Sequence, residues 1–173
     1  MAMRGNRNRA LRLCAYALMM LLIFLLQHSR GTAVQLWRAT ADAIPYFLAT
    51  LALLEGPYTA GIFGFFAGML LSLHAVTVEG LSALYLGLFG IVFGLLGSHY
   101  MRPVLPSALL GGTVCILLQG VLRYLFYYAL VYQMSMTAAL AELGAELLLS
   151  LLTGIPVYFL VRAVYRRFQE NEE

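Results

Sequence analysis

Six apolar stretches with almost no charge inside them follow one another along the chain. They predict helices at about 10–26, 37–54, 58–73, 80–97, 104–131 and 140–164. Most of these stretches approach the roughly 20 residues that a helix needs to cross the ~30 Å hydrocarbon core of a bilayer. The pattern therefore predicts an all-α integral membrane protein with six transmembrane helices. Residues 10–164 would form one domain between an arginine-rich segment, 1–12, and a polar tail, 165–173.

Composition agrees with this class of protein, because apolar residues make up 62% of the chain and mean hydropathy is +0.83. Six spans leave about 50 residues for tails and loops, too few for a soluble domain. The first apolar stretch also resembles a signal peptide, with a weak cleavage site at Ser29 and Gly31. Since five further stretches follow, we interpret it as an uncleaved span. Cys14 and Cys115 fall inside apolar runs and are interpreted as buried hydrophobic residues.

The arginines are divided unevenly between the two sides that six spans define. One side would carry Arg4, Arg7, Arg9, Arg12, Arg102, Arg162, Arg166 and Arg167. The other side has only Arg30, Arg38 and Arg123. The positive-inside rule then predicts that both termini are cytoplasmic.

Small residues mark a predicted helical hairpin. Gly56 and Pro57 form a tight turn, in which glycine supplies unusual dihedral angles and proline starts the next helix. Two glycine stripes at helical spacing follow this turn: Gly61, Gly64 and Gly68, and then Gly87, Gly90, Gly94 and Gly97. Helices in lipid associate closely where small residues let their backbones touch. We therefore expect the stripes to face each other, with a glycine-lined pore as the alternative.

Polar side chains gather in the predicted outer half of the spans, where ionisable groups are costly unless they are paired or functional. This set comprises Arg38, Asp42, Gln119, Arg123, Glu142 and Glu146. Arg123 and Glu146 are nearly equidistant from the turn near Ser135, which predicts an ion pair between them. Arg38 and Asp42 have the (i, i+4) spacing of a helical pair. The set either lines an outward-facing polar cavity or serves only as a structural clasp.

Motifs of catalysis, metal binding and nucleic-acid binding are missing from the sequence. His28, His74 and His99 have no metal-ligand spacing, and no HExxH, GxSxG or Walker sequence occurs. The N-terminal arginines serve topology and attraction to anionic lipid. The sequence thus predicts a protein that is not an enzyme and that has no cofactor or metal.

Residues 45–97 carry a family resemblance. Gly56-Pro57, Gly61, Gly64-Phe65, Gly68, Gly80 and the glycines of 87–97 follow a pattern that resembles the bacterial rod shape-determining protein MreD family. Pro45 suits the family's proline in the second span, and length and six-span plan agree over the whole chain. The acidic residue usual after this motif is Ser72 here, which leaves the role of that acid open.

The resemblance implies a non-enzymatic scaffold of the cell-elongation machinery in the cytoplasmic membrane. Its partners would be a single-span MreC-like protein, an MreB-like filament and a SEDS glycosyltransferase with its transpeptidase. The family's fold resembles the six-helix substrate-binding subunits of energy-coupling-factor vitamin transporters, which supplies the alternative function of a vitamin-binding subunit. Short outer loops at 74–79 and 133–137 favour the scaffold. An intramembrane lipid enzyme is a third hypothesis, without a supporting motif.

Overall fold

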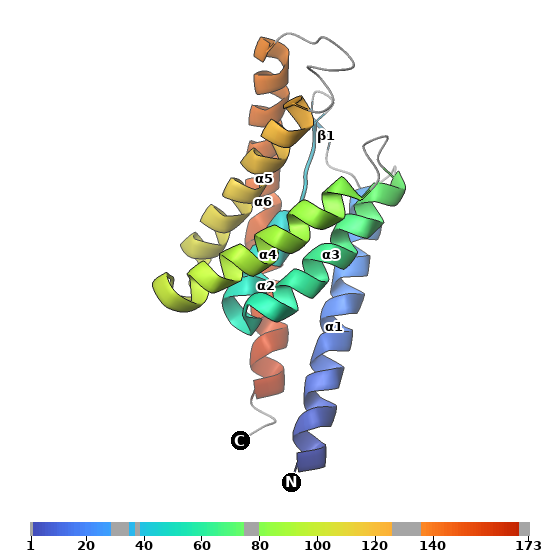
Figure 1. Ribbon diagram of the computed structural model, residues 1–173, viewed down its shortest axis with the longest axis vertical. Coiled ribbons are helices and arrows are strands. Elements are labelled where there is room, and N and C mark those ends of the chain that lie inside the picture. The colour runs from blue at the N-terminus through green and yellow to red at the C-terminus, as the bar shows by residue number, and fades with distance from the viewer. Residues whose placement is uncertain (1, 29–34, 37–38, 75–79, 126–135, 170–173) are drawn as a thin grey trace.

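The computed structural model describes residues 2–28, 35–36, 39–74, 80–125 and 136–169. The described helices are α1 (Ala2–His28), α2 (Ile44–Glu55), α3 (Pro57–His74), α4 (Leu81–Tyr100), α5 (Leu105–Arg123) and α6 (Met136–Gln169). A short antiparallel pair, β1 (Gln35–Leu36) and β2 (Ala39–Thr40), precedes α2. The start of α1 and the end of α6 lie at the same end of the molecule, as Figure 1 shows.

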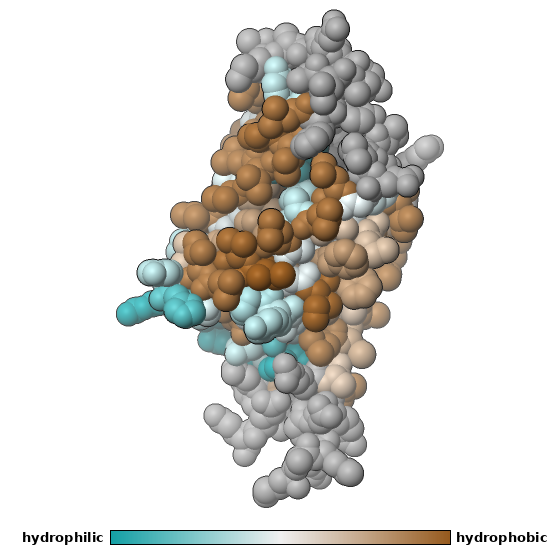
Figure 2. All heavy atoms as spheres, in the orientation of Figure 1, coloured by the Kyte–Doolittle hydropathy of each residue, from teal (hydrophilic) through white to brown (hydrophobic). Residues whose placement is uncertain are grey.

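Four of the described helices are long and apolar enough to cross a bilayer. The apolar segments are Ala10–Gln27, Leu81–Tyr100, Leu105–Arg123 and Leu143–Phe168. Large apolar side chains such as Leu18, Leu84 and Leu148 are largely exposed on their outer faces. Figure 2 shows apolar residues covering much of the visible described surface between the two ends. An outward-facing apolar surface of this kind suits lipid and would be costly in water, so the chain is a multi-pass membrane protein.

The prediction of six full spans is wrong for the second element. Helix α2 has 12 residues, which is about 18 Å of helix and too short for the hydrocarbon core. Residues 39–40 are a β-strand where the expected span 37–54 would be helical. Pro45 lies in the first turn of α2 and does not kink a longer helix, because a proline is tolerated where the N–H has no helical partner. Helix α3 is also shorter than the four long spans.

Two further boundaries differ from the prediction. Helix α6 continues to Gln169, so the first residues of the expected tail 165–173 are helical. The expected helix 104–131 is confirmed by α5 as far as Arg123, residues 124–125 continue it as a π-helical turn, and residues 126–131 lie outside the described part. Helix α1 begins at Ala2, so the arginine-rich segment 1–12 is largely helical.

Helix α2 forms the centre of the molecule (Figure 1). Residues 41–52 are all buried, and the helix packs against α3, α4, α5 and α6. The ring of Tyr46 fills the space that Gly112 and Gly154 leave, since a Cβ at Gly112 would overlap that ring. Its hydroxyl lies 3.2 Å from the Thr113 Oγ1. Residues 41–43, the irregular backbone before α2, are buried by the surrounding protein. Non-helical backbone is tolerated at membrane depth only where protein encloses it in this way.

Helices α3 and α4 form a hairpin along their glycines. A Cβ at Gly90 would lie 2.5 Å from the Ala60 carbonyl oxygen, and one at Gly94 would lie 2.5 Å from the Pro57 Cα. Added Cβ atoms at Gly64 and Gly68 would overlap the backbone of α4. The two backbones therefore touch at these four positions, and no side chain fits between them.

The remaining stripe positions are less constrained. The atoms nearest to Cβ atoms added at Gly61 and Gly97 belong to the side chains of Ile91 and Leu53, at 2.5 and 2.8 Å, and no backbone atom of a neighbouring helix lies closer than 3.6 Å. At Gly87 the nearest atom is the Phe65 Cβ at 3.5 Å, an ordinary van der Waals distance. The hairpin therefore does not require a glycine at 87. Gly56 in the turn has φ +88°, a conformation that favours glycine.

Candidate functional site

A buried polar cluster surrounds the start of α2. Asp42 is 8% exposed, and its Oδ1 accepts hydrogen bonds from the Ile44 N–H at 3.2 Å and from Gln27 Nε2 at 3.0 Å. The Asp42 backbone N–H donates to the Ser150 Oγ at 2.8 Å. Gln27 Nε2 also donates to the Ala41 carbonyl oxygen at 2.8 Å. These bonds join α1 and α6 to the start of α2. They also supply hydrogen-bond partners to the buried Asp42 carboxylate, which would otherwise have none.

Arg123 and Glu146 form an ion pair between α5 and α6. The two guanidinium nitrogens of Arg123 donate to the two carboxylate oxygens of Glu146 at 3.2 and 3.4 Å. The Glu146 side chain is 8% exposed and that of Arg123 is 31% exposed. This two-pronged geometry is the favourable one for a guanidinium and a carboxylate, and it neutralises both charges inside the bundle.

The structure brings only part of the predicted set together. Asp42 contacts Gln27 and Ser150, and it precedes α2 rather than lying in a helix. Arg38 and the Glu142 side chain lie outside the described residues. Gln119 occurs one turn before Arg123 on α5, and its Oε1 is buried without a hydrogen-bond partner among the described groups.

Tyr85 of α4 was missed by sequence reasoning. Its hydroxyl is buried without a hydrogen-bond partner in the described part of the chain, and it is within electrostatic reach of Asp42, Arg123 and Glu146. A tyrosine in an apolar run gives no sign in the sequence that its hydroxyl will lie near buried charged groups. Gln27, the first polar residue after the expected helix 10–26, is likewise a member of the site that the sequence did not predict.

A second polar contact lies near the end of α2. The Arg12 Nε is 2.9 Å from the Glu55 Oε1, and the Tyr16 hydroxyl donates to the same oxygen at 2.9 Å. The Arg12 guanidinium also lies over the Tyr165 ring, 5.6 Å from its centroid. The sequence predicts for Arg12 only the roles of the N-terminal arginines in topology and in attraction to anionic lipid. The structure shows that it also ties α1 to the α2–α3 turn and to α6.

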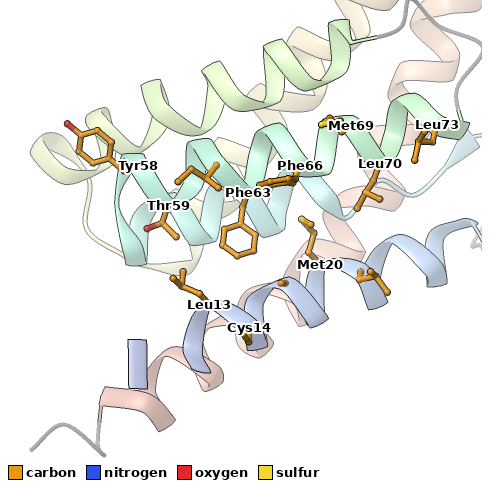
Figure 3. A pocket seen from close by; sticks show the side chains of 13 residues that line it. Leu13, Cys14, Met20, Tyr58, Thr59, Phe63, Phe66, Met69, Leu70 and Leu73 are labelled. Atoms are coloured by element: carbon orange, nitrogen blue, oxygen red, sulfur yellow. The ribbon is translucent and has the colours of Figure 1, made fainter. Parts of the chain in front are cut away.

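A lateral groove with a volume of about 810 Å³ runs between α1 and α3 (Figure 3). We call it the α1–α3 groove, and it is lined by Leu13, Cys14, Ala17, Met20, Leu21, Tyr58, Thr59, Ile62, Phe63, Phe66, Met69, Leu70 and Leu73. Cys14 is exposed in it, so the interpretation of this cysteine as buried is wrong, whereas Cys115 is buried. The groove is apolar along most of its length.

A second groove of about 800 Å³ lies on the other side of the hairpin. We call it the α4 groove, and it is lined by Gly61, Phe65, Leu81, Ala83, Leu84, Tyr85, Gly87, Leu88, Phe89, Ile91, Val92, Leu118 and Leu122. Gly61, Ala83 and Gly87 contribute small residues to this surface. Such residues let an approaching helix come close to the backbone.

Within the described part of the chain, no three histidine, cysteine or acidic side chains are grouped so that they could hold a metal ion. Compared with models of known protein families, with curated proteins and with solved structures, the chain matches none. The hairpin, the polar cluster and the two grooves are therefore the features of the molecule that bear on its function.

Proposed function

We propose that the chain is a non-enzymatic scaffold of the bacterial cell-elongation machinery, similar to proteins of the MreD family. Residues 56–97, the larger part of the segment 45–97 that carries the resemblance, build the α3–α4 hairpin, and four of their glycines lie against the backbone of the facing helix. The proposed partner is a single-span MreC-like protein. An MreB-like filament and a SEDS glycosyltransferase with its transpeptidase would be neighbours in the same assembly.

The observation that carries this proposal is the α4 groove. Its small residues offer a second helix a close approach, which is the main source of helix association in lipid. Gly87 lines this groove although the hairpin has room for a Cβ at this position. The hairpin tolerates a Cβ at this position, whereas a partner helix in the groove would favour the smaller glycine.

Depletion tests the proposal. Rod-shaped cells that lose the protein should become round, and the tagged protein should copurify with a single-span MreC-like protein. Leu84→Trp, which fills the α4 groove, should fail to restore rod shape. Leu18→Trp is the matched control, because Leu18 is similarly exposed, at 72% against 68%, and lines neither groove. Rod shape that persists after depletion would contradict the scaffold.

The location that goes with this function is the cytoplasmic membrane with both termini in the cytoplasm. The arginine distribution supports this orientation. Cysteines placed at Asn6 and Asn171, in a chain without Cys14 and Cys115, should resist an impermeant thiol reagent in intact cells. A cysteine at Gln133 should react. Labelling at either terminus would overturn the orientation.

A vitamin-binding transport subunit is the second candidate, because two buried polar groups have no hydrogen-bond partner in the described part of the chain. The Tyr85 hydroxyl and the Gln119 Oε1 are both buried without described partners, and a polar ligand would satisfy them. If this is the function, a water-soluble vitamin should raise the thermal midpoint of the purified protein, and Gln119→Leu should abolish that shift. Under the scaffold proposal, no vitamin in such a panel shifts the midpoint.

A further inference from the structure

We propose that the α1–α3 groove binds an anionic phospholipid, with the acyl chains along the groove and the headgroup at the end where α1 begins. This site is separate from the α4 groove and does not depend on the proposed scaffold function. The inference rests on the polarity of the groove along its length and on the charge at one of its ends.

Polarity along the groove is uneven. Thr59 supplies a hydroxyl group at the end of the groove that Leu13 borders, whereas the ring of Tyr58, which also lines this end, is directed away from α1 (Figure 3). Towards the other end, near Leu73, the lining of α3 consists of phenylalanine, methionine, leucine and isoleucine. A polar end followed by a long apolar channel matches a phospholipid, which has a polar headgroup and apolar chains.

Charge at the polar end favours an anion. In the helical repeat of α1, Arg9 comes one turn before Leu13, and Arg7 comes two turns before Cys14. These two positions thus lie on α1 one and two turns before the residues that line the groove. Arg12 is not available to a ligand in the same way, because Glu55 pairs with it.

The same charges disfavour a partner helix as the occupant. A single-span helix carries its own basic residues on the side where arginines gather, because the positive-inside rule applies to both proteins. Two basic flanks would then meet at the polar end of the groove. A negatively charged headgroup meets the same arginines favourably, each contributing a factor of about five in affinity near a charged lipid surface.

Cys14 provides a direct probe of occupancy, since it lines the groove and is exposed while Cys115 is buried. The full chain, purified and delipidated in detergent, is treated with a hydrophobic maleimide in the presence of dioleoylphosphatidylglycerol or dioleoylphosphatidylcholine. The anionic lipid should slow modification of Cys14 by about tenfold at concentrations where the zwitterionic lipid has little effect. The control is Leu88→Cys in a Cys14→Ser chain, which reports on the α4 groove and should respond equally to both lipids.

Two variants test the two parts of the site. Arg7→Gln with Arg9→Gln should raise the phosphatidylglycerol concentration for half-protection by about 20- to 30-fold. Ala17→Trp, which fills the groove, should reduce the phosphatidylglycerol retained in native mass spectra. The proposal would be overturned if both lipids protect Cys14 equally or if neither protects it. It would also be overturned if the double arginine variant needs the same phosphatidylglycerol concentration for half-protection. The variants used in these tests leave the core intact. A photocrosslinker on Cys14 in native membranes that yields mainly a protein adduct would overturn it in favour of a partner helix.

Discussion

Helix α2 is buried inside the bundle, whereas the α3–α4 hairpin packs against it and exposes large side chains such as Leu84 on its outer face, and different contacts hold the two. The hairpin is held by direct contact of two backbones, with glycines where any side chain would collide. Helix α2 is held by large side chains such as Tyr46 and by hydrogen bonds at its entry, where Asp42 contacts α1 and α6. Backbone contact has little tolerance for added atoms, whereas side-chain packing and polar bonds can be altered one group at a time.

The largest effect should follow from Gly94→Leu. The added Cβ alone would lie 2.5 Å from the Pro57 Cα, so the two helices must separate. Overpacking usually costs 1–3 kcal/mol, and a backbone neighbour that cannot move aside puts this variant at about 3 kcal/mol or more. Thermal unfolding in detergent measures the loss. Leu88→Ala, in which an exposed side chain is shortened, is the control and should change the midpoint far less. Equal damage in both variants would contradict the backbone contact.

The second effect concerns the Arg123–Glu146 pair. Replacing either residue by methionine leaves its partner charged and unpaired inside the bundle. Fully buried pairs lose about 3–5 kcal/mol in this way, and the 31% exposure of Arg123 makes a smaller loss expected here. The double replacement should recover stability relative to either single one. Additive losses in a double-mutant cycle would show that the two side chains do not interact.

These two regions also show what the sequence could predict. The glycine stripes repeat at helical spacing within one continuous segment, so their periodicity alone indicated the contact face of α3 and α4. Arg123 and Glu146 were paired from their distances to one turn. The start of helix α2 has no such periodic signal in the sequence. The apolar run 43–54 is compatible both with a short helix and with the second half of a full span. The start of α2 depends on Gln27 and Ser150, which come from distant parts of the chain.

The third effect tests the entry to α2. Ser150→Ala removes the acceptor of the Asp42 backbone N–H and leaves this buried donor unsatisfied, at a cost of about 1–3 kcal/mol. Ser72→Ala is the matched control, because the Ser72 hydroxyl bonds only to the Gly68 carbonyl oxygen of its own helix. Its expected cost is a few tenths of a kcal/mol at most. Similar thermal midpoints for the two alanine variants would mean that the Asp42–Ser150 bond contributes nothing to stability.

The smallest effect on stability should come from Gly87, and it separates packing within the hairpin from binding in the α4 groove. A Cβ at this position meets Phe65 at an ordinary 3.5 Å, and alanine favours a helix over glycine by up to about 1 kcal/mol. Gly87→Ala should therefore unfold at the same temperature as the parent or slightly above it. Gly87→Leu adds side-chain atoms in the α4 groove, so it should remain folded and yet lose copurification of the single-span partner. If Gly87→Leu unfolds like Gly94→Leu, the whole glycine stripe belongs to the hairpin. If Gly87→Leu stays folded and retains the partner, the binding surface lies elsewhere, and the proposed scaffold loses the observation that carries it.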